Sequence, residues 1–204
     1  KVHHLEVFTE ALKDPKGAPI IVPHLGTWEM MNAWIHQYGI PTIMYKPMKN
    51  EDFNAFALQA RQRLNATLVA TDANGVKTLF KNLKQGGFSI ILPDHVPQPS
   101  GGVVVPFFGI PCLTSTLASK MAQKTQCRLV GLSCFRREDG EGFEVYCDDL
   151  DDPNLYSPDI HIATTALNQA IEQMINRFPE EYMWGYKRFK GNPNFENYYQ
   201  PSSQ

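Results

Sequence analysis

Short apolar runs alternate along the chain with longer stretches in which hydrophobic residues recur at helical spacing. The apolar runs are rich in β-branched residues, which is typical of strands buried on both faces. The predicted strands span residues 19–22, 42–45, 67–70, 88–92 and 128–135, with a short extended piece at 103–105 and an edge strand at 143–146. The predicted helices span residues 27–38, 51–64, 76–83, 115–124 and 159–178.

This alternation indicates an α/β fold, in which a mostly parallel central sheet is flanked by helices. The length of 204 residues suits a single domain that spans residues 1–204. Ligands of open α/β sheets bind beyond the carboxyl ends of the strands, so polar residues at these ends are the first candidates for a site. The residues that follow the predicted strands in this way are His24, Lys46, Asp72, Asp94 with His95, and Arg136 with Arg137.

Composition narrows the choice of function. Hydrophobic residues make up 43% of the chain and charged residues 20%, as in ordinary globular proteins. The net charge of -2 gives no support to nucleic-acid binding. None of the four cysteines lies in a CxxC pair, so we expect no zinc site. Cys127, Cys134 and Cys147 lie in or beside apolar runs, which predicts reduced core thiols, with a single disulfide as the alternative. No apolar run reaches the roughly 18 residues of a membrane span, and because the chain starts at Lys1 we expect a further segment upstream.

His24 and Glu29 stand five positions apart in the stretch PHLGTWE, between the first predicted strand and helix. A carboxylate in the first turn of a helix is favoured by the helix dipole, and from there it could accept a hydrogen bond from one ring nitrogen of His24. That bond would fix the tautomer and leave the other nitrogen as a general base, able to deprotonate a hydroxyl that attacks an acyl carbonyl. The alternative is a packed histidine beside a helix-capping glutamate, which the pair taken alone favours.

The stretch HLGTWE resembles the H-x4-(D/E) motif of the glycerolipid acyltransferase superfamily. Other segments resemble, in the same order, the late acyltransferases of lipid A biosynthesis, the lauroyl/myristoyl transferase family of Gram-negative bacteria. These segments are IMYKP at 43–47, LVATDANGVKTLFKNLKQGG at 68–87, LPDHVPQPSGGVVVPFFGIP at 92–111 and PEEYMWGYKRFK at 179–190. The resemblance covers nearly the whole chain and implies a glycerol-3-phosphate acyltransferase-like fold, with His24 as general base and Glu29 as its orienting partner.

The resemblance also implies the substrates. The donor would be a fatty acyl chain on acyl carrier protein, the acceptor a hydroxyl of a lipid A precursor, and no cofactor would be needed. The enzyme would work at the cytoplasmic face of the inner membrane, with a membrane anchor in a segment upstream of this chain. The acidic carrier and the phosphorylated acceptor call for basic residues near the site, and the candidates are Lys46, Arg136, Arg188 and Lys190.

Four positions depart from the family pattern or correspond to it loosely. Lys46 stands where relatives often have arginine, and lysine lacks the planar two-pronged contact of a guanidinium. Asp94 lies in a segment that resembles the Pro-Glu-Gly region of relatives, where it would bind the acceptor or shape the site. Relatives commonly have W-x-H-R-R-F-K near the end, so Tyr186 and Lys187 in WGYKRFK differ from them.

Several residues keep two interpretations each. Arg61 and Arg63 contact a phosphate or the carrier, or they lie on a solvated helix face. Phe107 and Phe108 line an acyl groove or pack in the core. Trp28, Met30 and Met31, listed together because they flank His24, meet lipid or form the packed face of their helix. Residues 184–190 interleave aromatic and basic side chains, which suits RNA or anionic headgroups, and the net charge favours headgroups.

His95 beside Asp94 resembles half of a metal site, but no third ligand follows at suitable spacing, so we predict no catalytic metal. Two rival functions remain beside the lipid A hypothesis. One is an acyltransferase or thioesterase that uses the same histidine with another glycolipid, a phospholipid or water as acceptor. The other is a non-catalytic lipid-binding module with the same fold.

Overall fold

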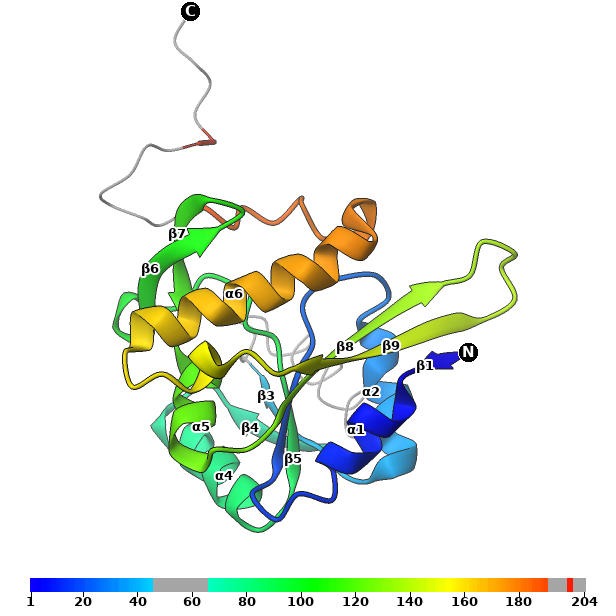
Figure 1. The fold of residues 1–204 in the computed structure, drawn as a ribbon, viewed down its shortest axis with the longest axis horizontal. Coiled ribbons are helices and arrows are strands. Elements are labelled where there is room, and N and C mark those ends of the chain that lie inside the picture. The colour runs from blue at the N-terminus through cyan, green and yellow to red at the C-terminus, as the bar shows by residue number, and fades with distance from the viewer. Residues whose placement is uncertain (46–65, 191–197, 200–204) are drawn as a thin grey trace, which may run out of the picture.

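The computed structural model describes residues 1–45, 66–190 and 198–199 (Figure 1). Its centre is a seven-stranded sheet with the order β1-β9-β8-β2-β5-β3-β4. Every pairing in it is parallel except that of β8 with β9, which confirms the predicted α/β fold with a mostly parallel sheet. The strands are β1 Val2–His3, β2 Ala18–Ile21, β3 Thr42–Tyr45, β4 Thr67–Ala70, β5 Phe88–Ile91, β8 Leu129–Arg136 and β9 Phe143–Leu150.

Helices cover both faces of this sheet. Helices α1 (Leu5–Ala11) and α2 (Glu29–Ile35) pack on one face. Helices α4 (Ala73–Lys84), α5 (Leu117–Thr125) and α6 (Ile160–Arg177) pack on the other. Figure 1 shows the two groups on opposite sides of the central strands, with α6 running across the top. Among the described residues, no helix combines the length and the apolar character that crossing a membrane requires.

The central strands are buried on both faces, which explains why they appear in the sequence as unbroken apolar runs. All positions of β2 and β5 are buried. Side chains alternate along a strand, so Ile20 packs in the cluster of Phe8 and Met31, while its neighbour Ile21 packs with Leu79 on the opposite face. Each helical layer therefore covers one face of the sheet, and a single strand sends alternate side chains into both layers.

A separate hairpin, β6 (Gly102–Phe107) with β7 (Ile110–Ser115), is antiparallel and lies against α6. Its turn places Phe108 in the left-handed region, at φ 48°, and Gly109 at φ 74°. The amide of Phe108 donates to Glu172 of α6 at 2.7 Å, and Asn168 donates from the same helix to the carbonyl of Pro106 at 2.8 Å. The sequence predicted only a short extended piece here, at residues 103–105.

Local hydrogen bonding explains where element boundaries differ from the prediction. Helix α4 begins three residues before the predicted start, because Asp72 caps it by accepting from the amide of Gly75 at 2.8 Å. Strand β9 continues to Leu150 and is not an edge, since β1 pairs with its outer side. The predicted helix at 51–64, with Arg61 and Arg63, lies outside the described residues.

Candidate active site

The loop after β2 fixes the backbone of His24. The amide of Gly26 donates to the carbonyl of Glu181 at 2.9 Å, and the carbonyl of His24 accepts from the amide of Met183 at 3.1 Å. Gly26 has φ +60°, and a Cβ built there would lie 2.2 Å from the carbonyl oxygen of Cys134 at the end of β8. Only glycine tolerates this close approach, so the loop is held between β8 and the segment that contains Met183.

A buried carboxylate holds the ring of His24. Asp94, three residues beyond β5, accepts from the His24 backbone amide through Oδ2 at 2.9 Å. Its Oδ1 lies 2.8 Å from Nδ1 of the ring. The exposed fraction is 7% for His24 and 2% for Asp94, so water does not compete for these contacts. Strands β2 and β5 are parallel neighbours, which brings the residues that follow them together at one edge of the sheet.

The hydrogen bond to Asp94 sets the protonation of the imidazole. Burial acts to raise the pKa of Asp94, but the hydrogen bonds from the ring and backbone of His24 outweigh burial and hold that pKa below its ordinary value. An ionised carboxylate only accepts hydrogen bonds, so Nδ1 of His24 donates. Nε2 has no hydrogen-bond partner among the described residues and is left to accept a proton.

Tyr182 completes this buried group. Its hydroxyl donates to Oδ2 of Asp94 at 3.1 Å. Burial, together with the negative charge of Asp94, raises the pKa of Tyr182, so the phenol remains a donor. Asp94 thus accepts three hydrogen bonds, two from His24 and one from Tyr182, which leaves its side chain little freedom to rotate.

Aromatic rings enclose His24. His95 stacks on it with ring centroids 3.8 Å apart and planes 6° apart, and Tyr186 stacks on the far face of His95 at 4.2 Å. Trp28 meets His24 edge-on at 4.8 Å. His95 is exposed as a residue, but loss of water from its covered ring faces lowers its pKa, so the stacked ring is neutral at neutral pH. His95 therefore packs directly on the ring of His24 and covers one face of it.

The position of Glu29 in the structure differs from the one expected of a carboxylate that orients His24. Glu29 is the exposed first residue of α2 and lies 3.4 Å from the side-chain nitrogen of Asn32. The ring nitrogen that an orienting carboxylate would hold, Nδ1 of His24, is bonded to Asp94. The orienting role of Glu29 stays a prediction, and the carboxylate that contacts Nδ1 in the structure is that of Asp94.

Of the predicted basic residues, Arg188 lies deepest. It is 3% exposed, and its guanidinium donates to the carbonyl of Leu113 at 2.7 Å and the hydroxyl of Thr114 at 2.8 Å. These bonds fasten the C-terminal segment to β7, beside the Phe107 ring. These contacts are explained by a structural role of Arg188. Its Nε is also buried and has no hydrogen-bond partner in the described residues.

The remaining basic candidates are dispersed. Lys190 is exposed, with its ammonium 4.8 Å from the ring centroid of Tyr186 and hence at the rim of the stack. Arg136 is exposed at the end of β8, over the ring of Phe143 at 5.2 Å. Lys46 lies outside the described residues. Lys190 therefore lies next to the site through its contact with Tyr186, whereas Arg136 contacts Phe143.

Apolar side chains are exposed next to His24. Met183, whose amide binds the His24 carbonyl, is 38% exposed, and Trp184 is 51% exposed. Trp184 contacts the ring of Phe108 at 5.8 Å and that of Tyr182 at 4.8 Å, so it joins the hairpin turn to the buried group. Tryptophan favours the boundary between water and lipid.

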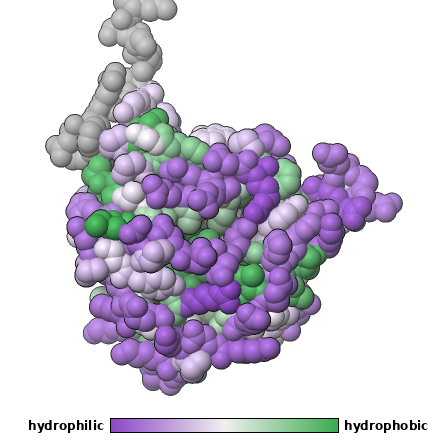
Figure 2. All heavy atoms as spheres, viewed as in Figure 1, coloured by the Kyte–Doolittle hydropathy of each residue, from purple (hydrophilic) through white to green (hydrophobic). Residues whose placement is uncertain are grey.

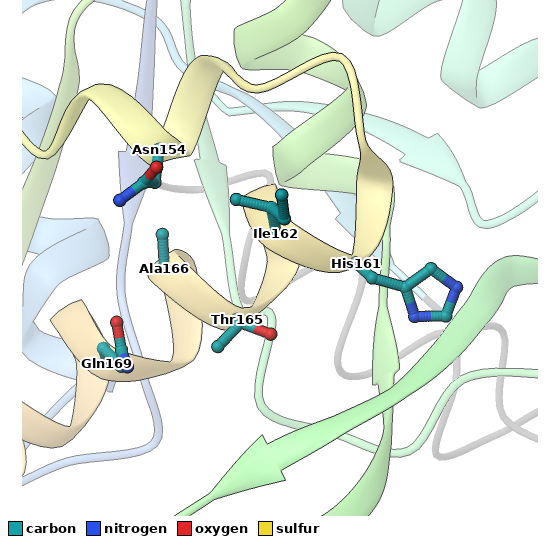
Figure 3. Close-up of a pocket in the computed structure, with 6 residues that line it drawn as sticks. All are labelled: Asn154, His161, Ile162, Thr165, Ala166 and Gln169. Atoms are coloured by element: carbon teal, nitrogen blue, oxygen red, sulfur yellow. The ribbon is translucent and has the colours of Figure 1, made fainter.

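A shallow hollow of about 270 Å³ lies elsewhere, where the short helix η3 (Pro153–Tyr156) meets the start of α6. Figure 3 shows the side chains around it: Asn154, His161, Ile162, Thr165, Ala166 and Gln169. No carboxylate or cation lines it, and His161 is exposed. In the described parts of the chain, no group of three histidine, cysteine or acidic side chains is arranged to hold a metal ion.

Sequence reasoning found His24 and Asp94 but did not pair them. The two residues are 70 positions apart, and their contact depends on β2 and β5 being neighbours in the sheet, which the order of elements does not reveal. A weak signal existed, since both residues follow buried strands. Tyr182 gave no such signal, because it comes after a helix and reaches Asp94 only through the folded C-terminal segment.

Comparison with known proteins adds independent information. The family model described as bacterial lipid A biosynthesis acyltransferase matches residues 1–191. A lipid A biosynthesis lauroyltransferase of Escherichia coli is 30% identical over 195 residues, which cover 93% of this chain and 61% of that protein. A lipid A biosynthesis palmitoleoyltransferase of Escherichia coli is 24% identical and covers 94% and 62%. A phosphatidylinositol mannoside acyltransferase of Mycolicibacterium smegmatis is 27% identical and covers 84% and 56%. The chain thus spans about three-fifths of the length of these relatives.

Proposed function

The chain belongs to the family of bacterial lipid A biosynthesis acyltransferases, and on that premise we propose that it transfers a fatty acyl chain to a hydroxyl of a lipid A precursor. The observation that carries this proposal is the buried contact of His24 with Asp94, which leaves Nε2 of the ring available at the edge of the sheet. The relatives named as lipid A acyltransferases support the choice of acceptor.

In this proposal His24 is the general base. Nε2 takes the proton of the acceptor hydroxyl while the hydroxyl oxygen forms a bond to the carbonyl carbon of an acyl thioester. The tetrahedral intermediate then breaks its carbon–sulfur bond, and the departing thiolate recovers the proton from Nε2. The products are an ester and a free thiol, and His24 ends in its starting state.

Asp94 has two tasks in this sequence of steps. Its Oδ1 keeps the proton of the imidazole on Nδ1, so that Nε2 is the basic nitrogen. When His24 becomes an imidazolium, the negative charge of Asp94 stabilises it. The resemblance implied this orienting role for Glu29, and the 2.8 Å contact supports Asp94 in its place.

We further propose acyl carrier protein as donor and the cytoplasmic face of the inner membrane as the place of reaction. The exposed side chains of Met183 and Trp184 support a lipid acceptor, since they adjoin the backbone of His24 and offer apolar surface at the site. Lys190 at the rim adds a positive charge that suits a phosphorylated headgroup.

A second acceptor class has specific support. Relatives named as phosphatidylinositol mannoside acyltransferases match 84% to 87% of this chain, so the same site architecture is compatible with a different glycolipid. The chemistry at His24 would be unchanged, and the difference would lie in the surfaces that bind the sugar and phosphate groups.

The test is a matrix of donors and acceptors analysed by mass spectrometry. Acyl carrier protein thioester is offered with a lipid A precursor, with phosphatidylinositol mannoside, or with water alone, and the products are identified by mass. Acylated lipid A precursor as the main product supports the proposal. Acylated mannoside selects the second candidate, free fatty acid alone indicates a thioesterase, and acyl-chain binding without turnover indicates a lipid-binding module.

A further inference from the structure

A groove of about 790 Å³ runs along α4 and reaches α5, apart from the residues of the active site. It is lined chiefly by lysines with an apolar floor: Lys77, Lys81, Lys84 and Lys124 around Val76 and Phe80. All four lysines are exposed, whereas Phe80 is half-buried and packs against the core. Figure 2 shows mainly hydrophilic residues over the lower part of the molecule, where α4 and α5 lie in this view.

The charge on these two helices is one-sided. Together they contain five lysines and not one aspartate or glutamate within their bounds. The whole chain has 21 acidic and 19 basic residues, so this segregation is local. Within the described part of the chain, none of the groove lysines forms an ion pair.

The spacing makes this arrangement costly without a partner. Lys77, Lys81 and Lys84 recur at i, i+4 and i+7, which places their side chains in one row on α4. Like charges at i, i+4 destabilise a helix by a few tenths of a kcal/mol per pair. Lys124 adds a further charge from α5, with its ammonium 5.2 Å from the Phe80 ring centroid. An acidic partner would relieve this repulsion on binding.

The shape of the groove favours a protein over a bilayer. A small apolar floor of Val76 and Phe80 among cationic side chains suits an amphipathic acidic helix, in which carboxylates flank a few apolar side chains. Binding to a membrane surface usually inserts exposed apolar residues. The large hydrophobic residues that are exposed lie elsewhere among the described residues: Met30, Ile40, Ile162, Met183, Trp184 and Tyr198.

The groove starts near the active-site edge of the sheet and runs away from it along α4. Helix α4 begins directly after β4, at the sheet edge where His24 follows β2, because the strands of this part of the sheet are parallel. At 1.5 Å per residue, the middle of the lysine row at Lys81 lies only about 14 Å along the helix from its cap, Asp72. Lys84 and Lys124 therefore lie toward the opposite edge of the sheet, and a partner seated on α4 would approach the edge where acyl transfer is proposed through the Lys77 end of the groove.

We propose that the α4–α5 groove is the docking surface for the acidic face of acyl carrier protein. The identity of this partner rests on the proposed function, because only an acyl-transfer reaction calls for an acidic protein that presents a thioester. The groove itself is inferred from its charge and shape alone.

Direct binding tests the surface without relying on turnover. Fluorescently labelled holo acyl carrier protein is titrated with the 204-residue chain, and the dissociation constant is measured by anisotropy at low and at physiological ionic strength. The double variant Lys77→Glu/Lys81→Glu should bind at least about tenfold more weakly, and the salt dependence of its binding should be reduced. The matched control is Lys13→Glu/Arg137→Glu, which reverses two exposed charges away from the groove and should bind like the wild type.

A kinetic comparison separates this inference from the proposed function. Transfer from a small acyl thioester should be unchanged in Lys77→Glu/Lys81→Glu, while KM for the carrier-bound donor should rise. Carrier binding that depends on the lysines without any acyl transfer would support the groove and defeat the proposed function. Unchanged carrier affinity in a folded double variant would overturn the groove. Loss of binding to anionic lipid vesicles alone would overturn it as well, and assign the surface to a membrane.

Discussion

Replacing Asp94 with asparagine should leave the fold in place and disable the base. The amide has one oxygen and one NH₂ group where the carboxylate has two oxygens. Its oxygen can keep the two bonds made by Oδ2, from the His24 amide and from Tyr182, which places the NH₂ group against Nδ1. Nδ1 must then accept, so the imidazole proton moves to Nε2 and that nitrogen can no longer take the proton of a hydroxyl.

The expected magnitude follows from this change of tautomer. An analogous aspartate-to-asparagine change in a serine protease lowers kcat by about 10⁴, and removal of a general base typically costs about 10² to 10⁴. We therefore expect kcat for acyl transfer to fall by about 10³ to 10⁴ in Asp94→Asn, with little change in KM. Replacing the charge-assisted bond at Nδ1 with a neutral one should destabilise the fold by about 1 kcal/mol, the typical difference between the two kinds of hydrogen bond.

The effect of Asp94→Asn on the free energy of unfolding should depend on pH in a defined direction. Because the pKa of Asp94 in the folded protein lies below its ordinary value, the ionised carboxylate contributes stability above the unfolded pKa of about 3.9. That contribution is lost as the pH falls through the lower, folded pKa. The difference in unfolding free energy between wild type and Asp94→Asn should therefore be full at neutral pH and shrink below about pH 4.

The assays are single-turnover acyl transfer, urea unfolding across pH, and nitrogen NMR of His24 to identify the protonated ring nitrogen. Glu29→Gln is the matched control, since it makes the same chemical change at the other candidate carboxylate. We expect it to leave the proton of His24 on Nδ1. The reasoning is refuted if Asp94→Asn keeps the tautomer and most of the activity, or if Glu29→Gln is the variant that changes the tautomer.

Three further substitutions test other parts of the account. Gly26→Ala should destabilise the protein by at least about 1–2 kcal/mol from the left-handed backbone alone, and by more from the clash with the Cys134 carbonyl, and a melting temperature equal to wild type would contradict this. Arg188→Met should cost about 2–3 kcal/mol in urea unfolding, because it removes the donors to Leu113 and Thr114, and Arg188→Lys should recover part of the loss. The wild type should lose stability as the pH falls below about 6.5. The pKa of His95 is lower in the folded protein than in the unfolded chain, so protons bind the unfolded chain first and favour it. The groups that surround His95 are His24, Asp94, Tyr186, Arg188 and Lys190. His95→Gln should make this acid-side loss smaller, and equal slopes of stability against pH would count against the stacked neutral ring.

The fold was largely predictable because its signals are local. Apolar runs such as residues 19–22 and 88–92 are buried on both faces of the sheet, and the helix after Asp72 begins with a capping side chain. Helix α1 and strand β1 were missed, since both are short and their stability comes from packing against β9. The hairpin strand β7 was missed for a similar reason, because it is held by pairing with β6, which in turn packs against α6.

The site was predictable only in part, because its contacts are long-range. His24 was identified from the motif and from its place after a strand. Its partner depends on sheet order, which sets Asp94 beside it, and on a C-terminal segment that brings Tyr182 to the same carboxylate. Arg188 is the opposite case. Its basic side chain suggested substrate binding, but in the structure it is buried and donates a hydrogen bond to β7.

The central claim is that His24 is the general base for acyl transfer. The most direct measurement is the rate of transfer from acyl carrier protein thioester to a lipid A precursor by wild type and His24→Ala, with folding checked by circular dichroism. If His24 is the base, the wild type forms the acylated product and the variant is slower by about 10² to 10⁴. Transfer by a folded His24→Ala variant at a rate near that of the wild type would contradict it.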